Sequence, residues 1–410
     1  CFGAISFNIN TGDKTIHLAD AVILCTGGHT RIWKRSSSRK LENNGDGYYL
    51  ALKAGCELID MEMVQFHPTG MLFPEAYIGR LVTEAVRGEG GRLFNKHGER
   101  FMSKYDKERM ELSTRDIVAI ANYTEIMEGR GTPNGGVFLD ISHKNKEFII
   151  SKIPNIYNQF IETQMVDISK SPMEVAPTAH YSMGGIYVKA NDHSTNIKGL
   201  YAAGEAAGGL HGANRLGGNS LSEILVFGKI AGEKASEFSN NLTSHEISET
   251  VIKKANENIE KLIKKGDQFA INLQNDLQKI MWENCGVIKK RTNLEKGIEK
   301  INLLKKAFSN IDICIDNNFN DLINTFDLAA SIMTAEATLK SSLERNESRG
   351  AHQRSDYPNI NRERNYNVLT KLIENNIYIY KKECKKLRMD LLENLKKSKV
   401  DEDVSDKLLE

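Results

Sequence analysis

The pattern of hydrophobic and polar positions divides the 410-residue chain into parts of different character. Residues 2–9 and 15–25 are apolar runs around a turn at residues 12–13, and they predict two strands. The second run ends at Thr26-Gly27-Gly28, and residues 45–58 open on glycines and continue with helical character. A buried strand, a glycine turn and a helix in this order indicate an α/β nucleotide-binding layer.

The middle of the chain is more mixed. From about residue 63 to 178, turn residues are frequent and short segments of both kinds alternate, which predicts an inserted α+β domain. Residues 185–190 predict a strand. The segment 199–232 is rich in glycine and ends in a predicted helix that we expect to begin at Ser220, because serine is favoured at helix N-caps.

The C-terminal part is predicted to be helical. From about residue 245 to 345, apolar positions recur at helical spacing among many lysines and glutamates, which predicts two or three amphipathic helices with solvated faces. A polar link then precedes a further helix predicted over residues 367–397.

Composition excludes several classes of protein. The net charge is +1, which does not suggest a nucleic-acid or membrane-surface partner, and we find no run of about 18 apolar residues that predicts a transmembrane helix. The six cysteines are scattered and form no CxxC pair, which disfavours a zinc site or an iron–sulfur cluster held by this chain alone. Reduced thiols in a cytoplasmic setting are the simplest interpretation.

Two histidines stand where apolar runs meet turns. In "MEMVQFHPTG" (61–70), His67 precedes Pro68, which we expect to end the strand because proline cannot donate to a sheet ladder. In "APTAHYSMGGI" (176–186), His180 precedes a Gly-Gly turn. Alone, each histidine is equally explained as a core residue at a strand end. Together with Arg215 in the glycine-rich segment, they suggest a pocket for a dicarboxylate, which arginine binds in a bidentate fork.

Two further clusters carry charge. In "LVTEAVRGEGG" (81–91), Thr83, Glu84 and Arg87 lie close in sequence, and on their own they form an ordinary ion-pair pattern. In "STRDIVA" (113–119), Arg115 read alone is an exposed helix charge. The glycine density of residues 204–221 indicates either tight turns or close approach to a ligand, with the following helix pointing its positive end at an anionic group or an electron-rich ring.

The motifs quoted above, with "LVTEAVRGEGGRLFNKHGERFM" and "HGANRLGGNSLSEILVFGKIAG", resemble in order and spacing the flavoprotein subunit of succinate dehydrogenase and fumarate reductase. This family lies in a superfamily of FAD-dependent oxidoreductases that includes L-aspartate oxidase. The resemblance is detailed from Cys1 to about residue 235 and looser as far as "ESRGAHQRSDYP" (347–358).

The resemblance implies an α/β, Rossmann-like FAD-binding fold whose N-terminal part is missing, with an inserted α+β capping domain and a C-terminal helical domain. We expect the FAD-binding domain at 1–62, its return segment at 179–244, the capping domain at 63–178, the helical domain at 245–350, and a C-terminal tail with a helix at 351–410.

The same resemblance implies roles for single residues. Five residues match positions that hold the two carboxylates of succinate or fumarate, namely His67, Thr83, Glu84, His180 and Arg215. Arg115 matches the catalytic arginine that Glu84 and Arg87 reprotonate. Four positions are expected to bind FAD: Asp46 at the nucleotide, Glu205 at the adenosine ribose, and Ser220 and Leu221 against the isoalloxazine. The implied reaction is hydride transfer between flavin N5 and one methylene carbon, with a proton moved at the neighbouring carbon through Arg115.

The implied partners are the dicarboxylate substrate and an iron–sulfur subunit that takes electrons from the flavin, with membrane contact only through partner subunits at the inner face of the cytoplasmic membrane. Two alternatives stay open. One is L-aspartate oxidase, which makes iminoaspartate for NAD biosynthesis. The other is a non-catalytic subunit with the flavoprotein fold, for which we would expect damage to motif residues, whereas His67, Arg115, His180 and Arg215 are all present.

The sequence departs from the family pattern in one respect: no GxGxxG dinucleotide fingerprint occurs in these 410 residues. In the family this motif precedes the position at which the sequence begins, as does the histidine to which many members attach flavin. We therefore predict that residues 1–410, expressed alone, retain little or no FAD. Absorbance of the purified chain near 450 nm is the measurement, and stoichiometric flavin would contradict the prediction.

Overall fold

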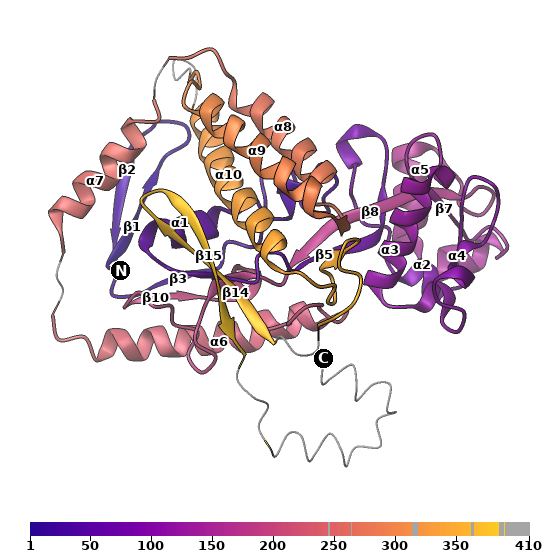
Figure 1. The fold of residues 1–410 in the computed structure, drawn as a ribbon, viewed down its shortest axis with the longest axis horizontal. Coiled ribbons are helices and arrows are strands. Elements are labelled where there is room, and N and C mark those ends of the chain that lie inside the picture. Colours follow the sequence, from indigo (N-terminus) through magenta and orange to yellow (C-terminus); the bar gives the residue numbers. More distant parts are fainter. Residues whose placement is uncertain (245–246, 264, 314–318, 362–364, 385–388, 390–410) are drawn as a thin grey trace.

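The computed structural model describes the chain except residues 245–246, 264, 314–318, 362–364, 385–388 and 390–410. Figure 1 shows an elongated molecule with a compact α+β body at one end, a helical bundle, α8 to α10, in the middle, and α7 with the β1–β2 hairpin at the other end. The long helix α6 runs along the lower edge of the molecule in this view. No helix in the described ranges is long and apolar enough to cross a membrane.

The N-terminal region builds the predicted α/β layer. An antiparallel hairpin of β1 (Gly3–Phe7) and β2 (Lys14–Leu18) is followed by β3 (Val22–Leu24), which pairs in parallel with β10 (Leu200–Ala202). The single strand expected over 15–25 is wrong, because the chain changes its pairing partner between β2 and β3. The predicted helix is confirmed as α1 (Asp46–Ala54).

A five-stranded sheet continues this layer in the order β11-β9-β4-β14-β15. It joins segments that are far apart in sequence, since β4 (Leu58–Ile59) pairs with both β9 (Gly185–Tyr187) and β14 (Tyr366–Ile373). The outer strands are β11 (Ala207–Gly208) and β15 (Asn376–Glu383). The strand expected at 185–190 is therefore confirmed as the short β9.

A four-stranded antiparallel sheet, β5-β8-β7-β6, forms the α+β body. Its strands are β5 (Val64–Met71), β8 (Met173–Ser182), β7 (Val137–Asp140) and β6 (Arg92–Phe94). The helices α2 (Ala85–Gly88), α3 (Arg115–Glu125), α4 (Lys146–Lys152) and α5 (Pro154–Gln164) accompany the sheet. Short single turns lie at Thr30–Ile32, Glu75–Tyr77, Phe101–Lys104, Met110–Leu112, Ile126–Arg130 and Gly204–Ala206.

The expected strand break at Pro68 is wrong. β5 continues to Met71, and its register against β8 shifts between His67 and Gly70. This bulge accommodates the missing N–H of proline. The carbonyl of Pro68 accepts a hydrogen bond of 2.9 Å from Asn122 Nδ2 on α3, so the irregular position is tied to the helix that covers it.

The remaining helices are α6 (Asn219–Asn240), α7 (Glu249–Glu260), α8 (Ala270–Asn284), α9 (Arg291–Phe308) and α10 (Asn320–Glu344). The helix expected after the glycine-rich segment is confirmed, but its N-cap is Gly218, whose φ of +86° favours glycine, and not Ser220. Between residues 245 and 345 the described part of the chain has four helices, where two or three were expected. The short strand β12 (Ile288–Lys289) separates α8 from α9 by pairing with β13 (Gln353–Arg354).

The helix expected over 367–397 is wrong for its first half. β14 and β15 form an antiparallel hairpin, whose turn residues Glu374 and Asn375 have φ of +48° and +64°. Two successive residues with positive φ are typical of the tight hairpin turn whose twist matches that of the flanking strands. Residues 385–388 and 390–397 lie outside the described residues.

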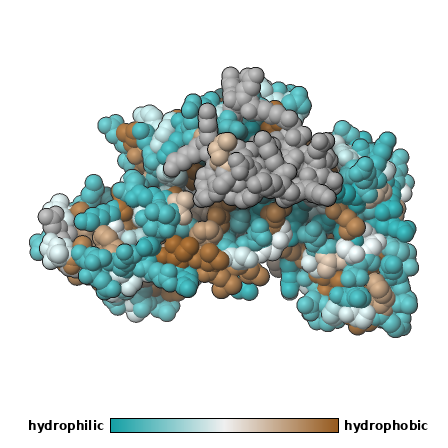
Figure 2. Space-filling view, turned by 90° about the horizontal axis from the view of Figure 1, so that it is seen from below, coloured by the Kyte–Doolittle hydropathy of each residue, from teal (hydrophilic) through white to brown (hydrophobic). Residues whose placement is uncertain are grey.

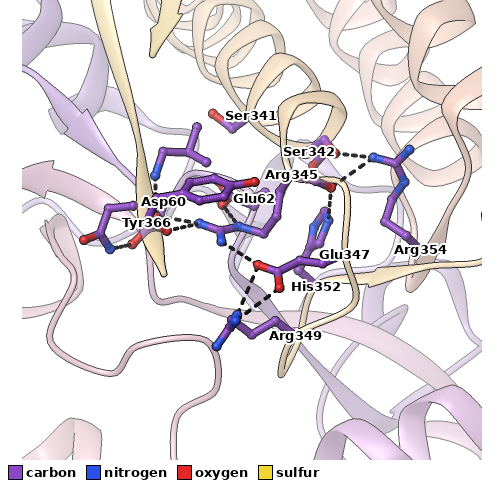
Figure 3. Close-up of polar contacts among 12 residues, drawn as sticks. Asp60, Glu62, Ser341, Ser342, Arg345, Glu347, Arg349, His352, Arg354 and Tyr366 are labelled. Atoms are coloured by element: carbon purple, nitrogen blue, oxygen red, sulfur yellow. Dashed lines mark hydrogen bonds and ion pairs between the residues drawn. The ribbon is translucent and has the colours of Figure 1, made fainter. Parts of the chain in front are cut away.

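A buried ion network joins the end of α10 to the segment between β4 and β5 (Figure 3). The Arg345 guanidinium lies 2.5 Å from Glu62 Oε1, 2.9 Å from Glu347 Oε1 and 3.2 Å from Asp60 Oδ1. Only 2% of the Arg345 side chain is exposed. Burial opposes its charge, but Glu62 and Asp60 raise the pKa of Arg345, so the cation is held in place by the carboxylates.

We predict that Arg345→Met lowers the free energy of unfolding by about 3–5 kcal/mol, because it leaves buried carboxylates without their counter-charge. Urea denaturation measures the change. The matched control is Lys229→Met, which removes an exposed ion pair with Glu233 on α6 and should change stability by no more than about 0.5 kcal/mol. Equal effects of the two substitutions would contradict a stabilising role for the network.

Candidate active site

Two neighbouring strands bring the histidines together. His67 lies on β5 and His180 on β8, and their rings are 5.5 Å apart in an edge-to-face arrangement. His67 Nδ1 lies within hydrogen-bond distance of the Thr69 backbone, 3.2 Å from its carbonyl oxygen and 3.3 Å from its N–H group. His180 Nδ1 shares a hydrogen bond of 2.9 Å with the hydroxyl of Ser37. Each ring is therefore fixed through Nδ1.

Both imidazoles are neutral at ordinary pH. Burial, then the neighbouring His180 and Arg115, lower the pKa of His67 well below its usual range. Burial, followed by Arg215 and Arg115, lowers the pKa of His180 to about 3. The two rings thus act as hydrogen-bonding groups and leave the positive charge of the site to the arginines.

The two charged clusters meet across the site. Arg115 begins α3, and its Nε donates to Glu84 Oε2 at 2.8 Å, while Arg87 Nη2 lies 3.7 Å from Glu84 Oε1. Only 17% of the Arg115 side chain is exposed, so it is not the exposed helix charge that its local sequence suggests. Arg87 is buried, with 1% of its side chain exposed, and 47% of the Glu84 side chain is exposed. Glu84 therefore links two arginines and also reaches solvent.

Gln65 connects Arg115, the candidate catalytic residue, to Arg215. Its Oε1 accepts from Arg215 Nη2 at 3.2 Å and lies 3.5 Å from Arg115 Nη1. Its Nε2 donates to Asn214 Oδ1 at 2.8 Å and to the Arg215 carbonyl at 2.7 Å. One amide thus holds two guanidinium groups of like charge near each other. This arrangement is unfavourable for the charge of Arg215, because burial and the nearby Arg115 both lower the pKa of Arg215.

Several buried arginine nitrogens make no hydrogen bond within the described chain, namely Arg87 Nε, Arg87 Nη2 and Arg215 Nε. A buried donor without a partner costs free energy unless a ligand or water supplies an acceptor. An anion with several oxygens fits this need. Thr83, by contrast, lies exposed before α2, and its hydroxyl accepts only a long bond of 3.4 Å from the Ala85 N–H.

The four positions expected to bind FAD lie at two helix starts and one short turn. Asp46 is the first residue of α1, and burial raises the pKa of its carboxyl group. Glu205 lies in the turn Gly204–Ala206 and accepts a hydrogen bond of 2.9 Å from the Ser182 N–H, and burial raises its pKa to about 7. Ser220 and Leu221 are in the first turn of α6.

The sequence analysis missed some residues that the structure brings to the site. Gln65 had a local signal, since it stands two positions before His67 on the same strand face. His29 had none: it is fully buried, and its two ring nitrogens contact the hydroxyls of Ser182 and Thr338 at 2.8 and 3.2 Å. Burial lowers the pKa of His29 to about 3, so it joins these segments as a neutral ring.

The start of α6 is open on one side. The open side of Gly218 has no atom within 4 Å, so the positive end of a 22-residue helix is accessible to an electron-rich ring. Figure 2, seen from below, shows hydrophobic side chains gathered on the face where α6 lies. The exposed apolar residues of this helix are Leu221, Ile224, Leu225 and Val226. An exposed apolar surface of this kind marks a contact with a ligand or with another protein surface.

Comparison with known proteins agrees with these features. Residues 1–221 match the family described as FAD binding domain, and residues 274–400 match the family described as fumarate reductase flavoprotein C-term. The chain belongs to the fumarate reductase and succinate dehydrogenase flavoprotein family. The resemblance, the fold class and FAD as the cofactor of the family are thereby confirmed.

Individual relatives support the same assignment. The chain is 48% identical over 373 residues to an uncharacterized FAD-dependent oxidoreductase of Methanocaldococcus jannaschii, covering 90% of this chain and 67% of that protein. It is 43% identical over 357 residues to one subunit of the fumarate reductase (CoM/CoB) of Methanothermobacter marburgensis, covering 87% and 64%. Sdh1 of Mycobacterium smegmatis, solved in complex with UQ1, aligns with a TM-score of 0.87 at 38% identity, covering 97% and 68%. The chain thus spans about two thirds of the length of these relatives.

We predict that His180 stays neutral from pH 8 to pH 5 in the ligand-free protein, because burial and two arginines hold its pKa at about 3. Since the unfolded chain takes up a proton near the ordinary pKa, this histidine contributes stability above that value and loses it as the pH falls toward about 3. NMR of ¹⁵N-histidine side chains measures the charge, and His17, exposed on β2, serves as the control for a ring that solvent can reach. Protonation of His180 near pH 6.5 would contradict the account.

Proposed function

We propose that this protein is the flavoprotein subunit of a succinate dehydrogenase or fumarate reductase and interconverts succinate and fumarate with FAD. The observation that carries the proposal is that Arg115, paired with Glu84 beside Arg87, is linked through Gln65 to Arg215, while two neutral histidines lie together on β5 and β8. Family relatives named for these enzymes support it.

In this proposal, Arg215, His67 and His180 hold the substrate carboxylates, with Thr83 as a further contact. Arginine suits a carboxylate because its planar fork donates two parallel hydrogen bonds. The histidines, being neutral, add donors without adding charge repulsion to the arginines. Holding both ends of a dicarboxylate fixes the carbons between them, which lowers the barrier by positioning.

Arg115 gives or takes the proton at one substrate carbon. An arginine normally keeps its proton, so this role requires a group that returns the proton at once. Glu84 is such a group, since its carboxylate accepts directly from Arg115 Nε and is half exposed to water. Arg87 is buried beside Glu84 and would complete the relay. Burial lowers the pKa of Arg87, and the neighbouring Glu84 opposes part of that shift. FAD, when bound, supplies the hydride acceptor or donor; Asp46, Glu205, Ser220 and Leu221 are the residues proposed to hold it.

The proposed partner is an iron–sulfur subunit that exchanges electrons with the flavin. It is supported by the relatives, whose names describe them as subunits. A cytoplasmic location, with membrane contact only through such partners, remains part of the proposal.

We predict that Arg115→Gln in the full-length flavoprotein lowers kcat for succinate oxidation about 10³-fold or more, while the affinity for malonate changes much less. The glutamine retains hydrogen bonding but cannot supply the proton. Turnover with an artificial electron acceptor measures kcat, and Arg39→Gln, which removes an exposed arginine, is the control.

Normal succinate turnover by the Arg115→Gln protein would contradict the proton role. A wild-type protein that oxidises L-aspartate with oxygen in preference to succinate would instead identify the L-aspartate oxidase alternative.

A further inference from the structure

We infer that Tyr181, Glu223 and His211 form an anchor that orients the Arg215 guanidinium for one carboxylate of the substrate. The inference rests on the proposed function, because it takes Arg215 to be a substrate-binding residue. It assigns positioning roles to three residues that bring no reacting atom to the substrate.

Arg215 has few hydrogen bonds of its own to set its orientation. Only 5% of the residue is exposed. Its Nη2 donates to Gln65 at 3.2 Å, while its Nε has no partner within the described chain. The guanidinium carbon instead lies 4.1 Å from the centre of the Tyr181 ring. At this distance the cation is attracted to the face of the ring, so the tyrosine sets the plane of the guanidinium.

The Tyr181 ring is itself held at its hydroxyl. This group donates to a carboxylate oxygen of Glu223, which is 3% exposed. Burial, and then the bond to Glu223, raise the pKa of Tyr181, so the phenol keeps its proton and remains a donor. A carboxylate that accepts from a phenol also increases the electron density of the ring, which strengthens its attraction for a cation.

His211 completes the anchor. Its Nε2 donates to the same oxygen of Glu223 at 2.8 Å, and its ring packs edge-to-face on Tyr181 with the ring centres 5.6 Å apart. The Glu223 carboxylate therefore accepts from two fixed donors. Because these groups are nearly excluded from water, their hydrogen bonds have well-defined geometry and are not exchanged for bonds to solvent.

The position of Glu223 gives the anchor a second consequence. Glu223 lies one turn into α6, on the inward face, whereas Leu221 and Leu225 on the same helix are 66% and 73% exposed. The helix proposed to lie against the flavin thus also carries the carboxylate that fixes Tyr181 and, through it, Arg215. One element therefore sets the position of the substrate carboxylate relative to the cofactor.

The test uses the full-length flavoprotein with bound FAD and compares Tyr181→Leu, Tyr181→Phe, Glu223→Ala and Glu223→Gln. Loss of the ring in Tyr181→Leu should raise the malonate Kd and the succinate KM about 10-fold, and Tyr181→Phe and Glu223→Ala about 2- to 5-fold. Glu223→Gln, whose amide oxygen still accepts from the phenol, should keep the malonate Kd and the succinate KM close to those of the wild type. In the other three proteins kcat should fall less than KM rises.

Tyr105→Phe is the matched control, since it also removes a tyrosine hydrogen bond to a buried glutamate, Glu125, but within the α+β body. It should leave malonate affinity unchanged. A general loss of structure would instead lower the melting temperature and flavin content in parallel with kcat.

Two results separate the possible failures. A wild-type protein that oxidises succinate, combined with Tyr181→Leu and Glu223→Ala proteins of unchanged malonate Kd, would overturn the anchor and leave the proposed function intact. A wild-type protein that neither binds malonate nor oxidises succinate would overturn the proposed function and the anchor with it.

Discussion

The buried charge of Arg345 must be neutralised where it lies, and its partners tie the end of α10 to the segment that leads into β5, a strand of the candidate site. Two of its carboxylate partners, Asp60 and Glu62, stand between β4 and β5, so the end of α10 is fixed to the residues that lead into β5. Gln65 follows three positions after Glu62. A buried pair is not in itself evidence of high stability, but loss of either member is costly, so the network ties the end of α10 to the start of β5.

The site places three arginines near one another in a largely buried region, and this is unfavourable without an anion. Glu84 compensates part of the charge, Gln65 bridges Arg115 and Arg215, and the histidines stay neutral. The remaining positive charge, and Arg215 Nε, which has no hydrogen-bond partner within the described residues, are what a dianionic substrate would satisfy. Groups oriented in advance at low dielectric stabilise developing negative charge without the cost of rearranging during the reaction.

The sequence predicted the features that depend on local chemistry. The helix α1 between two glycines and the helix after the glycine-rich segment were recognisable from residues close together in the chain. The two histidines were recognisable in the same way, although His67 lies within β5 and not at its end. The family motifs extended this to the charged residues of the site.

Features set by distant partners were not predictable in the same way. The β14–β15 hairpin has apolar spacing compatible with a helix, and it becomes sheet because β4, some 300 residues earlier, pairs with it. Likewise, Pro68 stays within β5 only because β8 shifts its register beside it. Tyr181 and Glu223 gain their roles from the packing of α6 on β8.

The central claim is that Arg115 and the Arg215–histidine group face a single dicarboxylate. A crystal structure of the full-length flavoprotein with FAD and malonate tests it most directly. The account predicts that one malonate carboxylate binds Arg215 and His180, and that the carbon between the carboxylates lies beside the Arg115 guanidinium. Malonate bound without contact to Arg215, or with Arg115 turned away from it and no longer paired with Glu84, would contradict the account.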